Sequence, residues 1–279
     1  MYFRRLFRNI NFTIGFLITL IILLTALFSL GYTPYDPNRM NLSTRFQAPN
    51  PNHWLGTDQY GRDIFSRVMK GAVNSIIVGI VAVSIGISFG ILLGSLAAFY
   101  KKWVDESIMR ISDVLYGFPA VLSAILITSI LGPGVVNSMM AIGIFNIPIF
   151  ARLTRVTSLS IWERDYVTSA KAIGRSDAGI IWRHILPNIL SSLIVQGTVQ
   201  FAIAILAEAG LSYLGLGTQP PHASWGRMLQ EAQTFMGTSP WLAIFPGCAI
   251  ALAVLGFNLL GDGLRDMLDP KLSRIQQRG

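Results

Sequence analysis

The sequence predicts an all-α polytopic membrane protein with six transmembrane helices. The first observation is that 52% of its 279 residues are hydrophobic and that its mean hydropathy is +0.53. The second is that only 13% of the residues are charged, about half the share that a soluble domain carries. The third is that these charges separate long apolar runs, and about 20 apolar residues are enough to cross a bilayer.

The first apolar run covers Phe12–Leu30 and follows a short segment that carries Arg4, Arg5 and Arg8. A cleaved secretory signal would have an apolar region of about 7–15 residues with a cleavage site after it. This run is longer, and no good cleavage site follows it. We therefore expect residues 1–31 to form a cytoplasmic N-terminus and an uncleaved first span, because positive charge precedes the run and none immediately follows it.

Residues 32–70 are polar and rich in proline, which indicates an extended loop outside the membrane. Within it, Leu55–Asp58 has the composition of a turn. From Arg62 onward apolar residues recur with helical spacing. We expect this part to form an interfacial helix that leads into the next span.

Residues 71–279 are expected to form a membrane core of five spans. The second span of the chain is expected over Gly71–Tyr100, a run without charge in which Gly86, Gly90 and Gly94 recur every fourth residue. Such a stripe of small residues lets another helix approach closely. The sequence therefore predicts a tight helix–helix contact along this stripe.

A short charged segment at residues 101–113 is expected to lie at the cytoplasmic surface, and a charge-free run follows over Val114–Ala151. One helix of that length would be about 57 Å long, far more than the ~30 Å hydrocarbon core. The turn sequence Leu131–Gly134 lies in the middle, so we expect a third and a fourth span joined outside. Pro119 and Pro148 are expected to start or kink helices.

The fifth span is expected over Ile189–Ala207 and the sixth over Trp241–Leu260. Between them, residues 209–226 are rich in glycine and contain two adjacent prolines. This composition indicates an outer loop, with a partly re-entrant path as an alternative. Residues 262–279 are polar and basic and are expected to form a cytoplasmic tail.

The most polar stretch of the second half begins at Ser160 and ends at Asn188, between the fourth and fifth spans. Ser160 is followed three residues later by a glutamate, and this capping-box spacing predicts the start of a helix. Gly174 is expected to end that helix, Ser176 to cap a second one, and Pro187 to end the second. Two connected amphipathic helices between spans predict a docking surface for another protein.

Six spans place both termini and this polar stretch on one side of the membrane. All but six of the 22 Lys and Arg residues fall on that side, as the excess of positive charge in the cytoplasm requires. The six on the opposite side are Arg39, Arg45, Arg62, Arg67, Lys70 and Arg227. The polar stretch is therefore expected to face the cytoplasm, and we attribute the net charge of +8 to membrane topology rather than to nucleic-acid binding.

The sequence favours no catalytic or metal-binding function. It lacks a GxxxxGK[ST] phosphate-binding loop and an HExxH zinc motif. His53, His184 and His222 are far apart, and Cys248 is the one cysteine, so we expect neither a metal site nor a cofactor. The chain is therefore expected not to be an enzyme.

Glu208 and Tyr213 are candidates for the lining of a translocation pathway. Glu208 follows the fifth span closely, and a carboxylate near membrane depth is costly and tends to face a pathway or a partner charge. The alternative is that Glu208 marks the outer end of the helix in water. Tyr213 lies five residues further on.

The polar stretch resembles the cytoplasmic EAA loop of ABC importer permeases. The family pattern is EAA, three residues, Gly, nine residues, and Ile-x-Leu-Pro. Two positions depart from it: Thr168 replaces the acid and His184 replaces the isoleucine, and loss of the acid is common in the dipeptide, oligopeptide and nickel branch. The matching residues of this sequence are Ser169, Ala170, Gly174, Leu186 and Pro187.

Residues 55–72, 211–229 and 257–272 resemble the same branch, so the resemblance covers nearly the whole chain. It is similar to the second permease of systems that import dipeptides, oligopeptides or glutathione. The resemblance implies a type I ABC importer-like permease in the bacterial plasma (inner) membrane that forms half of the translocation pathway. It also implies a related permease, two cytoplasmic ATP-binding subunits and an outer substrate-binding protein as partners, with membrane lipid around the spans.

The resemblance further implies that the loop at residues 160–188 forms a coupling helix, which sits in a groove of an ATP-binding subunit. Hydrolysis of ATP on separate subunits would account for the missing phosphate-binding loop. Ala170 would be small enough for tight contact, and Gly174 would allow a sharp turn. The residues implied in this contact are Tyr166, Thr168, Ser169, Ala170, Lys171, Gly174, Arg175, Asp177, Leu186 and Pro187.

Three other interpretations of the sequence stay open at this point. The same architecture could import nickel or a metal chelate instead of peptides. A secondary transporter is a second alternative, although such proteins commonly show inverted repeats, which we do not find in this sequence. A membrane scaffold or insertion factor would explain the spans but not the specific loop.

Overall fold

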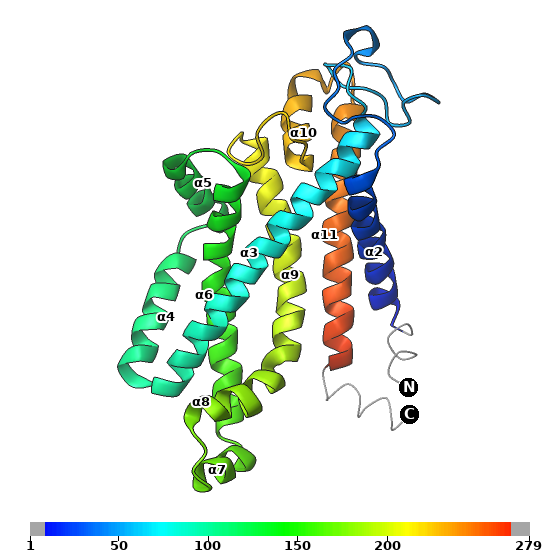
Figure 1. Ribbon diagram of the computed structural model, residues 1–279. Helices are drawn as coiled ribbons and strands as arrows, with labels where there is room; N and C mark the ends of the chain where they lie inside the picture. The colour runs from blue at the N-terminus through cyan, green and yellow to red at the C-terminus, as the bar shows by residue number, and fades with distance from the viewer. Residues whose placement is uncertain (1–8, 269–279) are drawn as a thin grey trace.

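The computed structural model describes residues 9–268, and within this range it is almost entirely helical. Long helices run along one axis of the molecule, and short helices lie at both ends (Figure 1). Five of the described helices are long and apolar enough to cross a membrane, or six if one bent pair is counted as a span. These observations confirm the predicted all-helical membrane fold. The arginines before residue 9 and the tail beyond residue 268 lie outside the described residues.

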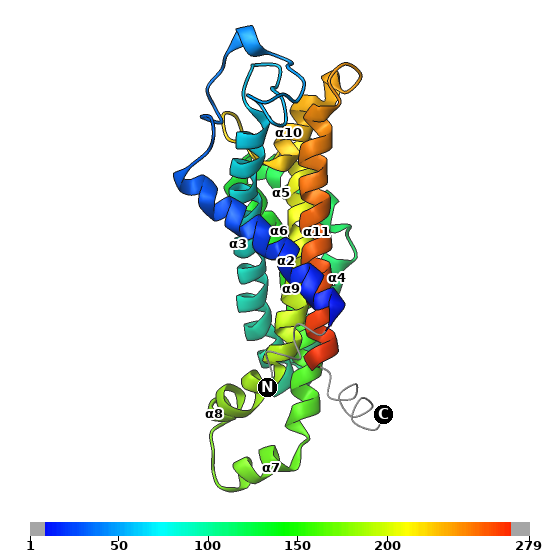
Figure 2. The ribbon, with the colours of Figure 1, turned by 90° about the vertical axis from the view of Figure 1, so that its right-hand side faces the viewer.

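Helix α2 (Ile10–Gly31) is the first span, close to its predicted bounds. The Asn9 side chain caps it by accepting a hydrogen bond from the Phe12 N–H. The helix crosses α11 (Trp241–Leu268) obliquely, with the two backbones close together (Figure 2). A Cβ added at Gly15 would lie 2.3 Å from the Leu260 backbone nitrogen, so this crossing requires glycine.

Helix α3 (Ile64–Tyr100) is one helix of 37 residues. The residues expected to form an interfacial helix that leads into this span are the first turns of α3, and no break separates them from the rest of the helix. Asp63 caps the helix by accepting from the Ser66 N–H at 2.8 Å. The side chain of Arg67, near the start of α3, is buried and forms an ion pair with Glu231. Such a partner allows a charged side chain to lie inside the protein.

A bent pair of helices replaces the straight third span that the sequence predicts. Helix α4 (Lys102–Tyr116) is followed by α5 (Ala120–Leu131), and the axes of the two differ by 89°. Pro119 lies directly before α5, as expected for a residue that starts a helix. Helix α6 (Val135–Trp162) is the fourth span and contains Pro148 in its interior.

Most of the expected surface segment at residues 101–113 belongs to α4, and its charged side chains are mostly exposed. Its location at the cytoplasmic surface stays a prediction. Asp105 pairs with Arg155 of α6, and Asp113 lies 2.6 Å from Arg152 of the same helix. These two ion pairs hold α4 beside α6. The polar residues of α4 therefore include side chains that hold this helix to α6 through ion pairs.

The glycine stripe of α3 packs against α6, as the sequence predicts. A Cβ added at Gly90 would lie 2.4 Å from the Phe150 Cβ, and one at Gly94 would lie 2.4 Å from the Ala151 carbonyl oxygen. Any side chain there would force the two helices apart. The stripe therefore sets the distance between α3 and α6.

The predicted helix start at Ser160 is wrong, because α6 continues through it to Trp162. The short helices that follow are α7 (Asp165–Ala172) and α8 (Asp177–Ile180), and Ser176 caps α8 as predicted. A π-helical segment, η2 (Ile181–Ile185), then leads without a break into α9 (Leu186–Tyr213).

The expected helix end before Pro187 is also wrong. In η2 the Leu186 N–H bonds to the Ile181 carbonyl five residues back, which widens the turn. The widened turn accommodates Pro187, the second residue of α9, which has no N–H to donate. The backbone stays helical past the proline for this reason.

The remaining short elements lie at the end of the bundle opposite α7 and α8 (Figure 1). They are η1 (Leu42–Thr44) in the long polar segment, α10 (Trp225–Ala232) and η3 (Gln233–Phe235). Helix α9 reaches Tyr213 and α11 reaches Leu268, so both extend further than the sequence predicts. The loop before α10 is accordingly shorter.

We predict that Gly90→Ala destabilises the protein by about 1–3 kcal/mol, because the added methyl group overlaps Phe150. Gly210→Ala in α9 is the matched control, since nothing lies within 4 Å of its added Cβ. We expect that variant to be neutral or more stable by about 0.4–1 kcal/mol. Thermal unfolding of both variants in detergent measures the difference, and equal midpoints would contradict the packing described here.

Candidate functional site

The loop between α6 and α9 is a folded unit with its own apolar interior. Val167 and Ala170 of α7 are buried against Ile180 and Ile185, next to the end of α6. Gly174 joins α7 to α8 with a φ of +80°, a conformation that glycine adopts without steric cost. The predicted turn at Gly174 is thus confirmed.

The residues that the sequence assigns to a contact with an ATP-binding subunit divide into three groups. Those exposed on the loop are Tyr166, Thr168, Ser169, Lys171, Gly174, Asp177 and Pro187, those partly buried are Arg175 and Leu186, and the buried one is Ala170. Ala170 retains 6% of its surface and packs inside the loop. Its close contact in this structure is therefore with its own chain.

Two exposed apolar side chains of the loop escaped the sequence analysis. Ile173, after the last turn of α7, is 82% exposed, and Trp182 in η2 is 72% exposed. Tyr166 adds a third apolar surface at 42% exposure. Large apolar side chains on a folded loop between charged residues are typical of a protein–protein contact. The sequence did contain a signal for this surface, because Ile173 and Trp182 are large apolar residues within the polar stretch 160–188.

Polar contacts hold this loop to the helices that enter and leave it. The Lys171 ammonium lies 4.1 Å from the centre of the Trp162 ring at the end of α6. Arg175 lies 3.2 Å from the His184 ring nitrogen Nε2, and the Tyr166 and His184 ring centres are 6.0 Å apart. These contacts attach the loop to the ends of α6 and α9.

Glu208 lies inside α9, which corrects the expectation that it follows the span. Its side chain has no exposed surface. The Ser212 hydroxyl donates to its Oε1 at 2.6 Å, the Thr218 hydroxyl donates to Oε1 at 3.3 Å, and the Ser75 hydroxyl donates to Oε2 at 3.3 Å. The carboxylate thus ties α9 to α3 and to the loop before α10. Tyr213 is 38% exposed.

A buried ion-pair network at the same end of the molecule also escaped the sequence analysis. Arg62 contacts Asp58 and Glu231, both at 2.6 Å, and Arg67 contacts Glu231 at 3.2 Å. Arg227 contacts the other oxygen of Glu231 at 3.2 Å. Asp58, Arg62 and Arg67 come from the stretch 55–72 and Arg227 from 211–229, so two of the stretches that carry the resemblance meet here. No local pattern pairs residues this far apart in sequence.

We predict that Glu208→Ala lowers the free energy of unfolding by about 2–3 kcal/mol, because three buried hydroxyl groups lose their acceptor. Glu208→Gln keeps an acceptor oxygen of similar shape and is expected to cost less than half as much. Thermal unfolding and proteolysis of the loop at residues 214–224 report the effect. Equal stability of the two variants would show that the hydrogen bonds do not hold this loop.

Two family models and several relatives that match this chain are membrane transport components. Residues 90–274 match the family described as binding-protein-dependent transport system inner membrane component. Residues 1–49 match the N-terminal TM domain of oligopeptide transport permease C. The dipeptide transport system permease protein DppC of Alkalihalophilus pseudofirmus is 45% identical over 97% of this chain and 89% of its own length.

A second relative and one solved structure agree with these matches. The glutathione transport system permease protein GsiD of Pectobacterium atrosepticum is 44% identical over 97% of this chain and 90% of its own length. The inward-facing MetNI methionine ABC transporter has a chain of similar fold, with a TM-score of 0.56. That likeness covers 72% of this chain and 94% of the other, at 16% sequence identity.

Proposed function

Because the chain belongs to the family of binding-protein-dependent transport system inner membrane components, we propose that it imports short peptides as a permease subunit of an ATP-driven ABC importer. The observation that carries the proposal is the likeness over 97% of the chain to permeases named for dipeptide and glutathione transport. Those names favour dipeptides, oligopeptides or glutathione over nickel or a metal chelate. The chain would form half of the translocation pathway.

Permeases of this family work with ATPase and substrate-binding components, in the inner membrane. For this chain we propose a related second permease, two ATP-binding subunits and an outer binding protein. The asymmetric distribution of Lys and Arg supports a cytoplasmic location for both termini and for the α7–α8 loop. It also supports an outer location for residues 32–63 and α10.

The α7–α8 loop is the proposed docking site for an ATP-binding subunit. Its apolar contacts would come from Tyr166, Ile173 and Trp182, which are exposed, and its charged rim from Lys171 and Asp177. Motion of the loop would pass directly into the membrane, since residues 177–213 form one helical unit.

Glu208 and Tyr213 have different proposed roles at the outer end of that helical unit. Tyr213 is partly exposed and would contact the transported solute. Glu208 would position the adjoining loop through its hydroxyl partners. The pathway role first assigned to Glu208 would in that case be indirect.

The proposed function is tested by reconstituting the chain with its companion subunits in lipid vesicles. We expect uptake of a labelled dipeptide that requires both ATP and the binding protein, because the chain itself lacks a phosphate-binding loop. Omission of either component should abolish accumulation. Uptake driven by a proton gradient in the absence of ATP would refute the proposal.

We predict that Ile173→Asp combined with Trp182→Asp reduces co-purification of the ATP-binding subunits by about thirtyfold, the effect of losing one interface hot spot of 2 kcal/mol. Trp54→Asp is the matched control, because Trp54 is 65% exposed at the opposite end of the molecule. Co-purification and ATP hydrolysis stimulated by the binding protein measure the result. Undiminished co-purification of the double variant would remove this surface from the interface.

A further inference from the structure

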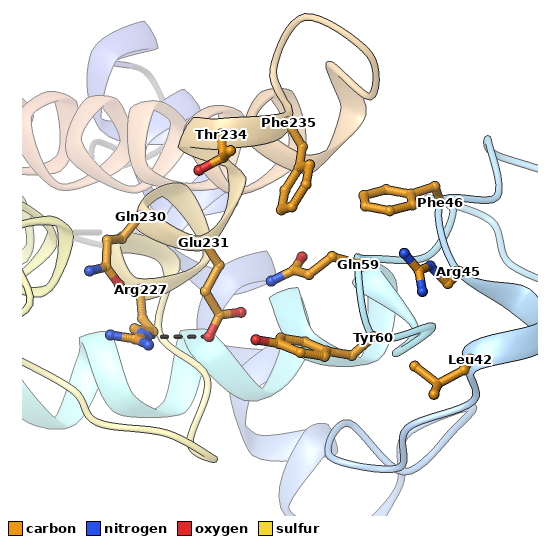
Figure 3. Close-up of a pocket in the computed structure, with 10 residues that line it drawn as sticks. All are labelled: Leu42, Arg45, Phe46, Gln59, Tyr60, Arg227, Gln230, Glu231, Thr234 and Phe235. Atoms are coloured by element: carbon orange, nitrogen blue, oxygen red, sulfur yellow. Dashed lines mark hydrogen bonds and ion pairs between the residues drawn. The ribbon is translucent and has the colours of Figure 1, made fainter.

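A cavity of about 530 Å³ opens at the end of the molecule that carries α10 (Figure 3). Its size lies within the range of about 300–1,000 Å³ that is usual for small-molecule sites. Four segments line it: the η1 region, the turn before α3, α10 and η3. The lining residues that the argument uses are Arg45, Phe46, Gln59, Tyr60, Glu231 and Phe235.

The apolar part of the wall is built from aromatic rings. The Phe46 and Phe235 rings are 4.9 Å apart and join the long polar segment to η3. The Tyr60 ring lies under the Arg62 guanidinium at 4.6 Å, which connects the cavity to the buried ion pairs behind it. These contacts give the cavity a wall supported by packing.

The charges around the cavity favour an anion. Glu231 and Arg227 line the cavity, and behind them lie Asp58, Arg62 and Arg67. The two carboxylates are shared among the three arginines, so cations already outnumber carboxylates. Arg45 adds a further positive charge on the cavity side. Within residues 9–268, no carboxylate forms an ion pair with Arg45. The guanidinium lies 5.7 Å from the centre of the Phe46 ring, a contact that leaves its N–H groups available to bind a carboxylate through two parallel hydrogen bonds.

The cavity also offers a free acceptor. The Gln59 side-chain oxygen is buried and has no hydrogen-bond partner in the part of the chain that the structure describes. In Figure 3 the Gln59 amide lies between the side chains of Glu231 and Arg45. A buried acceptor without a donor is costly, so a ligand that supplies an N–H group would relieve this cost.

We propose that this cavity is a binding site for the carboxylate and N–H groups of a free amino acid or short peptide. Arg45 binds the carboxylate, Gln59 accepts from the ligand nitrogen, and the aromatic wall contacts its side chains. The site deepens the proposed function and rests on it for the side of the membrane from which the ligand arrives. It gives the permease its own contact with solute, apart from the binding protein.

The experiment measures equilibrium binding of labelled dialanine, and of dialanine amide, to the assembled importer in lipid nanodiscs without its binding protein. We expect Arg45→Gln to weaken dialanine binding at least about tenfold, which corresponds to losing one charged hydrogen-bond pair. The amide lacks the carboxylate, so its weaker binding should not change in this variant. Gln59→Leu should weaken binding of both ligands.

Arg39→Gln is the matched control, because Arg39 is an exposed arginine of the same polar segment and does not line the cavity. We expect it to bind dialanine like the unmodified protein. Absence of saturable dialanine binding, or equal binding by the Arg45→Gln variant, overturns the proposal. It is also overturned if Arg45→Gln weakens only the association of the binding protein, because a side chain of that protein would then occupy the cavity.

ATP-dependent uptake with the binding protein, measured on the same preparations, separates this inference from the proposed function. Normal uptake without dialanine binding to the permease overturns the cavity site and leaves the importer function intact. Saturable binding that depends on Arg45, without any ATP-dependent uptake, overturns the importer function and retains the site.

Discussion

The close approach of α3 to α6 is the constraint on which the rest of this structure depends. Gly90 and Gly94 remove the side chains that would separate the two helices, so the backbones meet near the middle of the bundle. Helix α3 starts next to the buried ion pairs, and α6 ends at the α7–α8 loop. The contact therefore links the two ends of the bundle through two helices, and van der Waals packing of glycine against α6 supplies it.

Polar chemistry is concentrated at the ends of the bundle, where it connects segments that are distant in sequence. At the end that carries α10, the carboxylate of Glu231 joins α10 to the start of α3, and Glu208 joins α9 to the following loop. At the end that carries α7 and α8, Lys171 and Arg175 attach the α7–α8 loop to Trp162 and His184. Each such group is costly to bury alone, and its partners make its position specific.

The features that the sequence predicts correctly are those that local pattern determines. Apolar runs located the spans, the four-residue glycine spacing located the α3–α6 contact, and Gly174 and Ser176 located the break in the loop. The errors arise where distant partners or backbone adjustment decide. The charges of residues 101–113 do not reveal that Asp105 pairs with Arg155 of α6, and Pro187 looks like a helix end until the widened turn of η2 is seen. Neither the ion pair nor the widened turn can be recognised in a short window of sequence.

The unbroken helical unit from Asp177 to Tyr213 has a mechanical consequence. Figure 1 shows the α8 end turned away from the axis of α9, and the 28 residues of α9 correspond to about 42 Å at 1.5 Å per residue. A tilt of α9 by about 10° around the end that joins η2 would displace its other end by about 7 Å. Because Glu208 attaches that end to α3 and to the neighbouring loop, these two elements would have to move with it.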